Sequence, residues 1–147
     1  MTRQEFVRQA YAAASQSSEL SGMPALVTVA QAALESSWGQ SKLSHEANNY
    51  FGIKAHGNQG QVQMSTEEYE RGTAVAIKAG FAKYPSMLAC FQCRDRILLR
   101  SPIYAGARQM SGDEDGFIAA MAKHWATDPE YAEKLRVVLH EVKGLVQ

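Results

Sequence analysis

The chain has 147 residues, and its 15 basic and 15 acidic side chains cancel to a formal net charge of zero. The length predicts one domain, residues 1–147, that buries roughly two-thirds of the unfolded chain's surface. The balanced charge excludes bulk binding to nucleic acid or anionic membrane, and no stretch reaches the ~20 apolar residues that cross a bilayer. We therefore expect a monomer with no membrane span.

Helical spacing of apolar residues predicts a first amphipathic helix over residues 3–18, with Thr2 as its N-cap. A second helix is expected from Pro24, in its first turn, to about Trp38, with Gly39 as the C-cap. Five apolar residues should form its buried side: Leu26, Val29, Ala30, Ala33 and Leu34.

The remaining chain predicts one hairpin among further helices. Asn and Gly over residues 48–61 favour a long structured loop, and two extended runs around "ERG" predict a small β-hairpin. Helical segments are expected over residues 86–99 and 111–125, with a short piece around residues 104–109 between them, and from Pro129 onward with Asp128 as cap. This is an α+β arrangement, mostly helical with one hairpin.

Neither the cysteines nor the histidines predict a metal or cofactor. Cys90 and Cys93 form a single C-x-x-C, which we interpret as reduced helix cysteines rather than a redox or zinc site, with a disulfide as the alternative. The four histidines show no metal-ligand spacing: His45, His56, His124 and His140.

Glu35 ends an apolar helix in the stretch "ALESSWGQS", residues 33–41. The partial negative charge of the last helical carbonyls, and burial beside Leu34 and Trp38, would both favour the protonated carboxyl. A carboxylic acid that stays protonated near neutral pH can act as a general acid. Glycoside cleavage is the reaction that most often uses such a group, together with a second carboxylate on the opposite side of the bond. The alternative is a solvated surface charge.

The second carboxylate is expected in the hairpin. Glu67 and Glu68 alternate along a strand, so one of the two can face the cleft. The alternative is a pair of edge-strand charges that prevent aggregation.

Several linked motifs resemble those of glycoside hydrolase family 73. Residues 30–54, "AQAALESSWGQSKLSHEANNYFGIK", match its pattern E-S-x-W-G-x-S followed by N-N-x-F-G-I-K. Later pieces follow in the family's order: "STEEYERG", "AGFAKYPS", "PIYAGA" and "ATDPEYAEKL". The resemblance implies a lysozyme-like α+β fold whose hairpin lobe flanks a cleft. It also implies endo-β-N-acetylglucosaminidase activity on the β-1,4 bond between N-acetylglucosamine and N-acetylmuramic acid of peptidoglycan.

The resemblance implies three catalytic residues. Glu35 takes the place of the family's general acid, and Glu68, just before an aromatic residue, that of its second glutamate, with Glu67 as the fallback. In the family's Y-A-T-D-P-x-Y, Trp125 replaces the first tyrosine here, so Tyr131 keeps the hydroxyl. Tyr131 could equally anchor the last helix in the core.

Four residues are expected to bind substrate: Asn49, Tyr50, Glu67 and Trp125. Asn49 would shape a tight turn beside the acid, whereas Tyr50 would turn an aromatic face to the cleft. Phe51 is expected in the core, and Trp38 is expected to pack under the loop rather than bind sugar.

The sequence leaves the mechanism and the biological setting open. An inverting attack and a route assisted by the substrate's N-acetyl group both fit. The rival functions are a lytic transglycosylase or muramidase, and a catalytically inactive wall-binding module.

Three biological settings fit the sequence. The chain could be a phage lysin, a domain of a longer flagellar or autolysin chain, or an injected antibacterial effector with a cognate immunity protein. Without a signal peptide, we expect synthesis in the cytoplasm and action on peptidoglycan in the periplasm.

Overall fold

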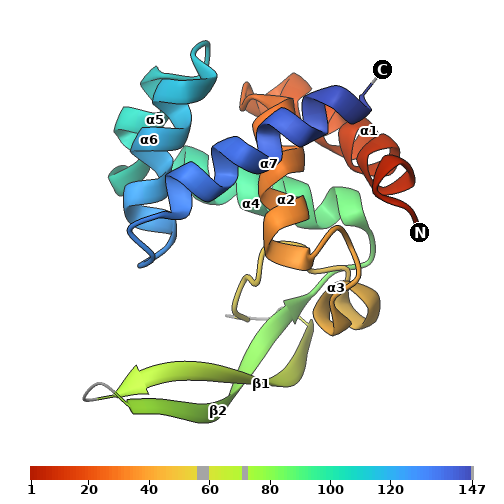
Figure 1. The fold of residues 1–147 in the computed structure, drawn as a ribbon, viewed down its shortest axis with the longest axis vertical. Helices are drawn as coiled ribbons and strands as arrows, with labels where there is room; N and C mark the ends of the chain where they lie inside the picture. Colours follow the sequence, from red (N-terminus) through yellow and green to blue (C-terminus); the bar gives the residue numbers. More distant parts are fainter. Residues whose placement is uncertain (56–59, 71–72, 147) are drawn as a thin grey trace.

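A helical body carries a two-stranded hairpin that projects from one end (Figure 1). The computed structural model describes residues 1–55, 60–70 and 73–146, and the side chains of residues 65–70, 77 and 78 lie outside that description. This arrangement confirms the predicted α+β class.

Seven α-helices and one 3-10 turn make up the helical part of the described chain. In order they are α1 (Arg3–Ser21), α2 (Ala25–Ser36), α3 (Lys42–Ala47), α4 (Met87–Arg100), η1 (Pro102–Tyr104), α5 (Ala105–Gln109), α6 (Glu114–Trp125) and α7 (Tyr131–Leu145).

The predicted Thr2 cap of α1 is confirmed, because its hydroxyl accepts from the Glu5 amide and the Glu5 side chain accepts from the Thr2 amide. The helix continues past the predicted end at Ser18, as far as Ser21.

The predicted bounds of α2 and α7 were wrong by one or two residues. Pro24 is the N-cap of α2 rather than part of its first turn, and the helix ends at Ser36, with Ser37 as a left-handed C-cap in place of Gly39. α7 begins at Tyr131 instead of Pro129, because Asp128 caps the preceding turn by accepting from the amide of Glu130. The six-residue helix α3 was not predicted, since so short a segment shows no clear period.

The predicted hairpin is confirmed. β1 (Gly60–Glu70) pairs antiparallel with β2 (Thr73–Lys83), in a register that runs from Gly60 opposite Lys83 to Glu70 opposite Thr73. The loop after α3 is joined to β2 at Ile53 and Ala55: the Ala55 amide donates to Gly80, and the Ala82 amide donates to Ile53. The hairpin base is thereby fixed to the segment that follows α3.

The helix α2 is the centre of the core and packs against both α1 and α7 (Figure 1). Of the predicted buried side, Val29, Ala30 and Ala33 are fully buried, whereas Leu26 and Leu34 are partly buried. The small alanine side chains allow neighbouring helices to approach closely, and burial of the apolar surface drives the packing. Three polar residues, Thr28, Gln31 and Ser36, are also buried in this helix.

Among the described residues, no helix is both long enough and apolar enough to cross a membrane.

Candidate active site

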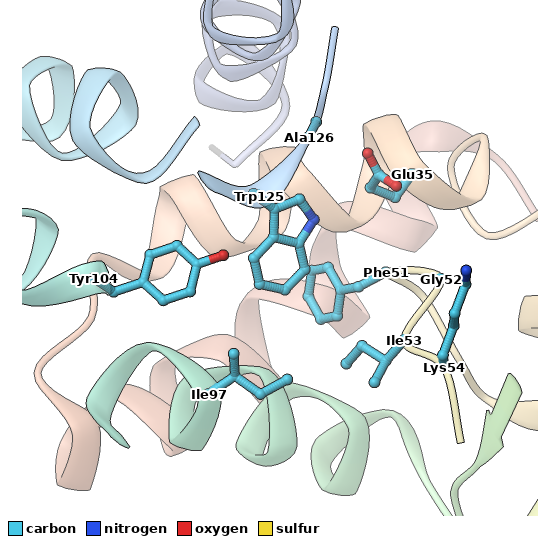
Figure 2. A pocket seen from close by; sticks show the side chains of 9 residues that line it. All are labelled: Glu35, Phe51, Gly52, Ile53, Lys54, Ile97, Tyr104, Trp125 and Ala126. Atoms are coloured by element: carbon cyan, nitrogen blue, oxygen red, sulfur yellow. The ribbon is translucent and has the colours of Figure 1, made fainter. Parts of the chain in front are cut away.

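A pocket of about 390 Å³ opens between the end of α2, the loop after α3, and the helices α4, η1 and α6 (Figure 2). Its walls are mainly aromatic and aliphatic, with one acid and one lysine. The lining residues are Glu35, Phe51, Gly52, Ile53, Lys54, Ile97, Tyr104, Trp125 and Ala126. An apolar cleft with a few polar groups is typical of a site that binds a small molecule or a chain of sugars.

Glu35 is the penultimate residue of α2, and a tight turn follows it. The Ser36 hydroxyl donates to the carbonyl of Ala32 at 2.6 Å and accepts from the amide of Gly39 at 2.9 Å. This one side chain therefore joins the last helical turn to the reversal of the chain. Ser41 then caps α3 by accepting from the amide of Ser44.

Three consecutive residues of this turn have left-handed backbone conformation: Ser37, Trp38 and Gly39, with φ of 51°, 58° and 78°. A Cβ atom at Gly39 would lie 2.8 Å from a ring carbon of Phe6, so glycine is required there by close approach as well as by its φ. Trp38 packs edge-on against Phe6, with the Arg3 guanidinium over its ring, so it contacts α1 and not the pocket. The pattern E-S-x-W-G-x-S is thus a turn that fixes the position of its glutamate.

The pocket raises the pKa of Glu35 above its ordinary value of 4.5. Glu35 is exposed by its surface area, but its side chain lines the pocket, where neighbouring atoms desolvate the charged carboxylate. This desolvation is the largest cause of the shift. A hydrogen bond with the Tyr131 side chain opposes the shift without cancelling it. Glu35 therefore keeps its proton to higher pH than an ordinary glutamate.

Tyr131 begins α7 and is buried against α2, with 5% of its surface exposed. Its hydroxyl accepts from Gln31 Nε2 at 3.2 Å, and it lies close enough to the Glu35 carboxyl to lower the pKa of that group. Burial, followed by the nearby charge of Glu35, raises the pKa of Tyr131 well above its usual value, so the phenol stays protonated. The structure thus brings the predicted Glu35 and Tyr131 together.

Trp125 ends α6 and forms a wall of the pocket, as Figure 2 shows. Its ring lies 6.3 Å, centroid to centroid, from both Phe51 and Tyr104. Tyr104 and Lys54 also line the pocket but were not among the predicted site residues. Both fall in quoted motifs, "PIYAGA" and "NNYFGIK", and those motifs were the signal that could have found them.

The structure does not bring Asn49 or Tyr50 to the pocket lining, although both were predicted as substrate contacts. Asn49 is buried, and its amide group is used internally: Nδ2 donates to the carbonyls of Ile53 and Ala82, and Oδ1 accepts from the amides of Phe51 and Ile53. It therefore shapes the loop that forms the pocket wall.

Tyr50 belongs to an aromatic cluster with Phe6 and Phe91, at centroid distances of 6.1 Å from each. Packing against these two buried rings turns it toward the body of the protein. The expected core position of Phe51 is confirmed, and the edge of this residue also reaches the pocket.

The side chains of Glu67 and Glu68 lie outside the described part of the structure. Their backbone positions in β1 are opposite Ala76 and Val75, respectively.

The described residues contain no cluster of three or more His, Cys, Asp or Glu side chains suited to a metal ion. Cys90 and Cys93 are buried thiols on α4 and form no disulfide with each other, as predicted for reduced helix cysteines. Burial raises the pKa of Cys90 to about 12, which makes it unreactive as a nucleophile.

Residues 11–144 match the family model described as mannosyl-glycoprotein endo-beta-N-acetylglucosaminidase. The chain belongs to this glucosaminidase family. The membership confirms the resemblance that the motifs indicated, and it covers nearly the whole domain.

The chain is 38% identical to the peptidoglycan hydrolase FlgJ of Escherichia coli K12 over 146 residues, which cover 95% of this chain and 47% of FlgJ. It thus spans about half the length of that relative. Among solved structures, the catalytic domain of the autolysin Auto from Listeria monocytogenes superposes with a TM-score of 0.87 at 32% identity, covering 97% of this chain and 86% of the domain.

A truncated glycoside hydrolase domain of Salmonella typhimurium FlgJ gives a TM-score of 0.80 at 33% identity, covering 97% of this chain and 99% of that domain. These likenesses confirm the expected lysozyme-like fold, mostly helical with one small hairpin.

Proposed function

We propose that this glucosaminidase hydrolyses the β-1,4 bond between N-acetylglucosamine and N-acetylmuramic acid in peptidoglycan. The observation that carries the proposal is the position of Glu35, which lines the pocket next to Tyr131 and has a raised pKa. Peptidoglycan is the substrate class because the similar FlgJ is named a peptidoglycan hydrolase. A neutral aromatic wall also suits sugar rings, which stack their apolar faces on Trp and Tyr side chains.

In this proposal Glu35 donates its proton to the glycosidic oxygen as the bond to the leaving sugar breaks. Desolvation keeps that proton available, and the Tyr131 phenol holds the carboxyl in place and stabilises the carboxylate that forms. Trp125 and Tyr104 would hold sugar rings across the pocket.

Glu68 is the proposed second carboxylate, with Glu67 as the alternative. It would either activate water on the opposite face of the sugar or stabilise the oxocarbenium-like centre while the substrate's N-acetyl group attacks. The anomeric form of the first product, followed by proton NMR, distinguishes inversion from the substrate-assisted route, which retains configuration.

The test compares Glu35→Gln with the wild type on purified peptidoglycan. We expect cleavage to fall by about 10²-fold or more, since glutamine cannot supply the proton. The matched control is Glu46→Gln, an exposed glutamate of α3 outside the pocket lining, which should cleave at the wild-type rate. Wild-type activity in Glu35→Gln, with both variants folded by circular dichroism, would remove the central claim.

Mass spectrometry of the digest separates the proposal from its rivals. Reducing-end N-acetylglucosamine supports a glucosaminidase, whereas anhydromuramic ends indicate a lytic transglycosylase. Binding to the wall without any released sugar would indicate an inactive wall-binding module.

We further propose that the enzyme is bacteriolytic when it reaches the periplasm, where its proposed substrate lies. The test expresses the chain in a Gram-negative host with and without an added export signal. Lysis should require both export and Glu35, so that the exported Glu35→Gln variant leaves the cells intact. Lysis by the variant would contradict this role.

A further inference from the structure

A buried chain of polar side chains connects the core to Tyr131. Arg94 of α4 is completely buried, and its Nε donates to Gln31 Oε1 at 2.9 Å. Gln31 of α2, also completely buried, donates from Nε2 to the hydroxyl of Tyr131 at 3.2 Å. Tyr131 in turn interacts with Glu35. Three helices thus contribute to one path that ends at the candidate acid.

The chemistry of arginine fixes the direction of every hydrogen bond in this path. A guanidinium has donors and no acceptor, so the Gln31 atom that faces it must be the carbonyl oxygen. The Gln31 amide nitrogen therefore faces Tyr131 and occupies a lone pair of its oxygen. The hydroxyl hydrogen of Tyr131 is left to point at Glu35.

Arg94 is itself fixed from the opposite side. Its Nη1 donates to Thr28 Oγ1 at 2.8 Å and to Asp95 Oδ1 at 2.9 Å. Asp95 accepts at its other oxygen from the hydroxyls of Ser17 and Ser21, at 2.6 and 2.8 Å. The guanidinium therefore has little freedom to turn away from Gln31.

We propose that Arg94 and Gln31 are positioning residues, which set the polarity of the path so that the Tyr131 hydroxyl donates to Glu35. The links from Arg94 to Gln31 and from Gln31 to Tyr131 rest on hydrogen-bond distances, whereas the consequence for catalysis rests on the proposed function. Neither residue lines the pocket, so both act through Tyr131.

A role in stability alone accounts poorly for this arrangement. Apolar residues of similar volume commonly replace buried ion pairs without loss of stability. Here the pair is kept although Arg94 Nη2 is buried and has no hydrogen-bond partner among the described residues, which costs free energy. The buried amide of Gln31 also requires hydrogen-bond partners, and Arg94 and Tyr131 provide them.

The test uses Gln31→Glu, which keeps the shape and the contact with Arg94 but cannot donate to Tyr131. The Tyr131 hydroxyl should then donate to residue 31, and Glu35 should lose its donor and gain a nearby negative charge. We expect kcat to fall by about 10- to 100-fold, with KM within about twofold, because the acid is misplaced rather than the sugar lost. The pKa of Glu35, from carbon NMR titration of its carboxyl, should move upward.

The other ionisable groups near Glu35 are unchanged by this substitution. They are Tyr131 on α7, Lys54 in the loop after α3, and Tyr104 on η1, with Arg94 behind Tyr131. The side chains of Glu67 and Glu68 of β1 lie outside the described residues. Gln16→Glu, on the exposed side of α1, is the matched control for the added charge and should leave both readouts as in the wild type.

A double-mutant cycle identifies the route. In the Tyr131→Phe background, Gln31→Glu should cause little further loss of kcat, because the path is already cut. The proposal would be overturned if the losses of kcat from Gln31→Glu and Tyr131→Phe were fully additive. It would also be overturned if Gln31→Glu had the kcat of the wild type and left the pKa of Glu35 unchanged. If Gln31→Glu fails to fold, Gln31→Met, which has a similar shape and no amide, is carried through the same cycle and judged by the same kcat criteria.

The NMR titration needs no activity, so the proposed function and the positioning role are judged separately. Absence of cleavage by the wild type would contradict the function, while the titration would still report whether Gln31 controls Glu35.

Discussion

At the scale of single residues, the interaction between Glu35 and Tyr131 governs the expected pH dependence. Cleavage should fall as pH rises through the pKa of Glu35, because the acid must be protonated. The Tyr131 hydrogen bond lowers that pKa, so Tyr131→Phe should move the falling limb of the kcat/KM profile to higher pH. We also expect about a tenfold loss of kcat from poorer placement of the acid. Initial rates on solubilised peptidoglycan across the pH range measure both.

The matched control is Tyr84→Phe, which removes a buried hydroxyl that contacts Cys93 away from the pocket. Its pH profile should match the wild type. A limb that stays in place in Tyr131→Phe, or moves equally in both variants, would contradict the role of Tyr131.

The raised pKa of Glu35 also carries a cost in stability. A carboxyl whose folded pKa exceeds its unfolded value makes the folded state bind more protons, so stability falls as pH rises from about 4.5 through the folded pKa. Glu35→Gln removes this cost, and its free energy of unfolding should exceed that of the wild type at neutral pH but not below the unfolded pKa. Urea denaturation at the two pH values checks the sign. A stability difference that does not change with pH would argue against desolvation of the carboxyl.

At the scale of elements, the loop after α3 depends on Asn49, whose amide holds together the backbone that forms one pocket wall. Asn49→Asp replaces two donors by a buried anion facing two carbonyl oxygens, so we expect a loss of about 3 kcal/mol or more of unfolding free energy. Asn48→Asp is the control: that side chain is half-buried and donates once, to the Tyr84 carbonyl, so about 1 kcal/mol is expected. Equal losses in chemical denaturation would contradict this account.

At the scale of the whole molecule, α7 joins the core to the site, since it packs on α2 and begins with Tyr131. Leu135→Ala empties a fully buried position on this helix and should cost about 2–5 kcal/mol. Val137→Ala, on the same helix but 69% exposed, should cost less than about 0.5 kcal/mol. Thermal unfolding monitored by circular dichroism measures both losses, and a small loss in Leu135→Ala would mean that α7 is not integral to the core.

The sequence by itself determined the class of fold, the hairpin and the candidate acid. Helical and alternating periods are local, so they predicted α1, α4, α6 and the two strands to within a few residues. Glu35 was identifiable because a short motif surrounds it. The helix ends were less accurate, as at Ser37, because a left-handed cap is decided by the packing of Gly39 on Phe6.

Only the tertiary structure decided which residues meet at the site. Tyr104 and Lys54 reach the pocket, while Asn49 and Tyr50 turn inward. The motif "NNYFGIK" contains Lys54 together with Asn49 and Tyr50, so the motif marks the region of the site but does not tell which of its residues face the pocket. The path from Arg94 through Gln31 to Tyr131 joins residues 63 and 100 positions apart. Such contacts depend on how α2, α4 and α7 pack, because side chains far apart in sequence become neighbours only when the helices bury their apolar faces together.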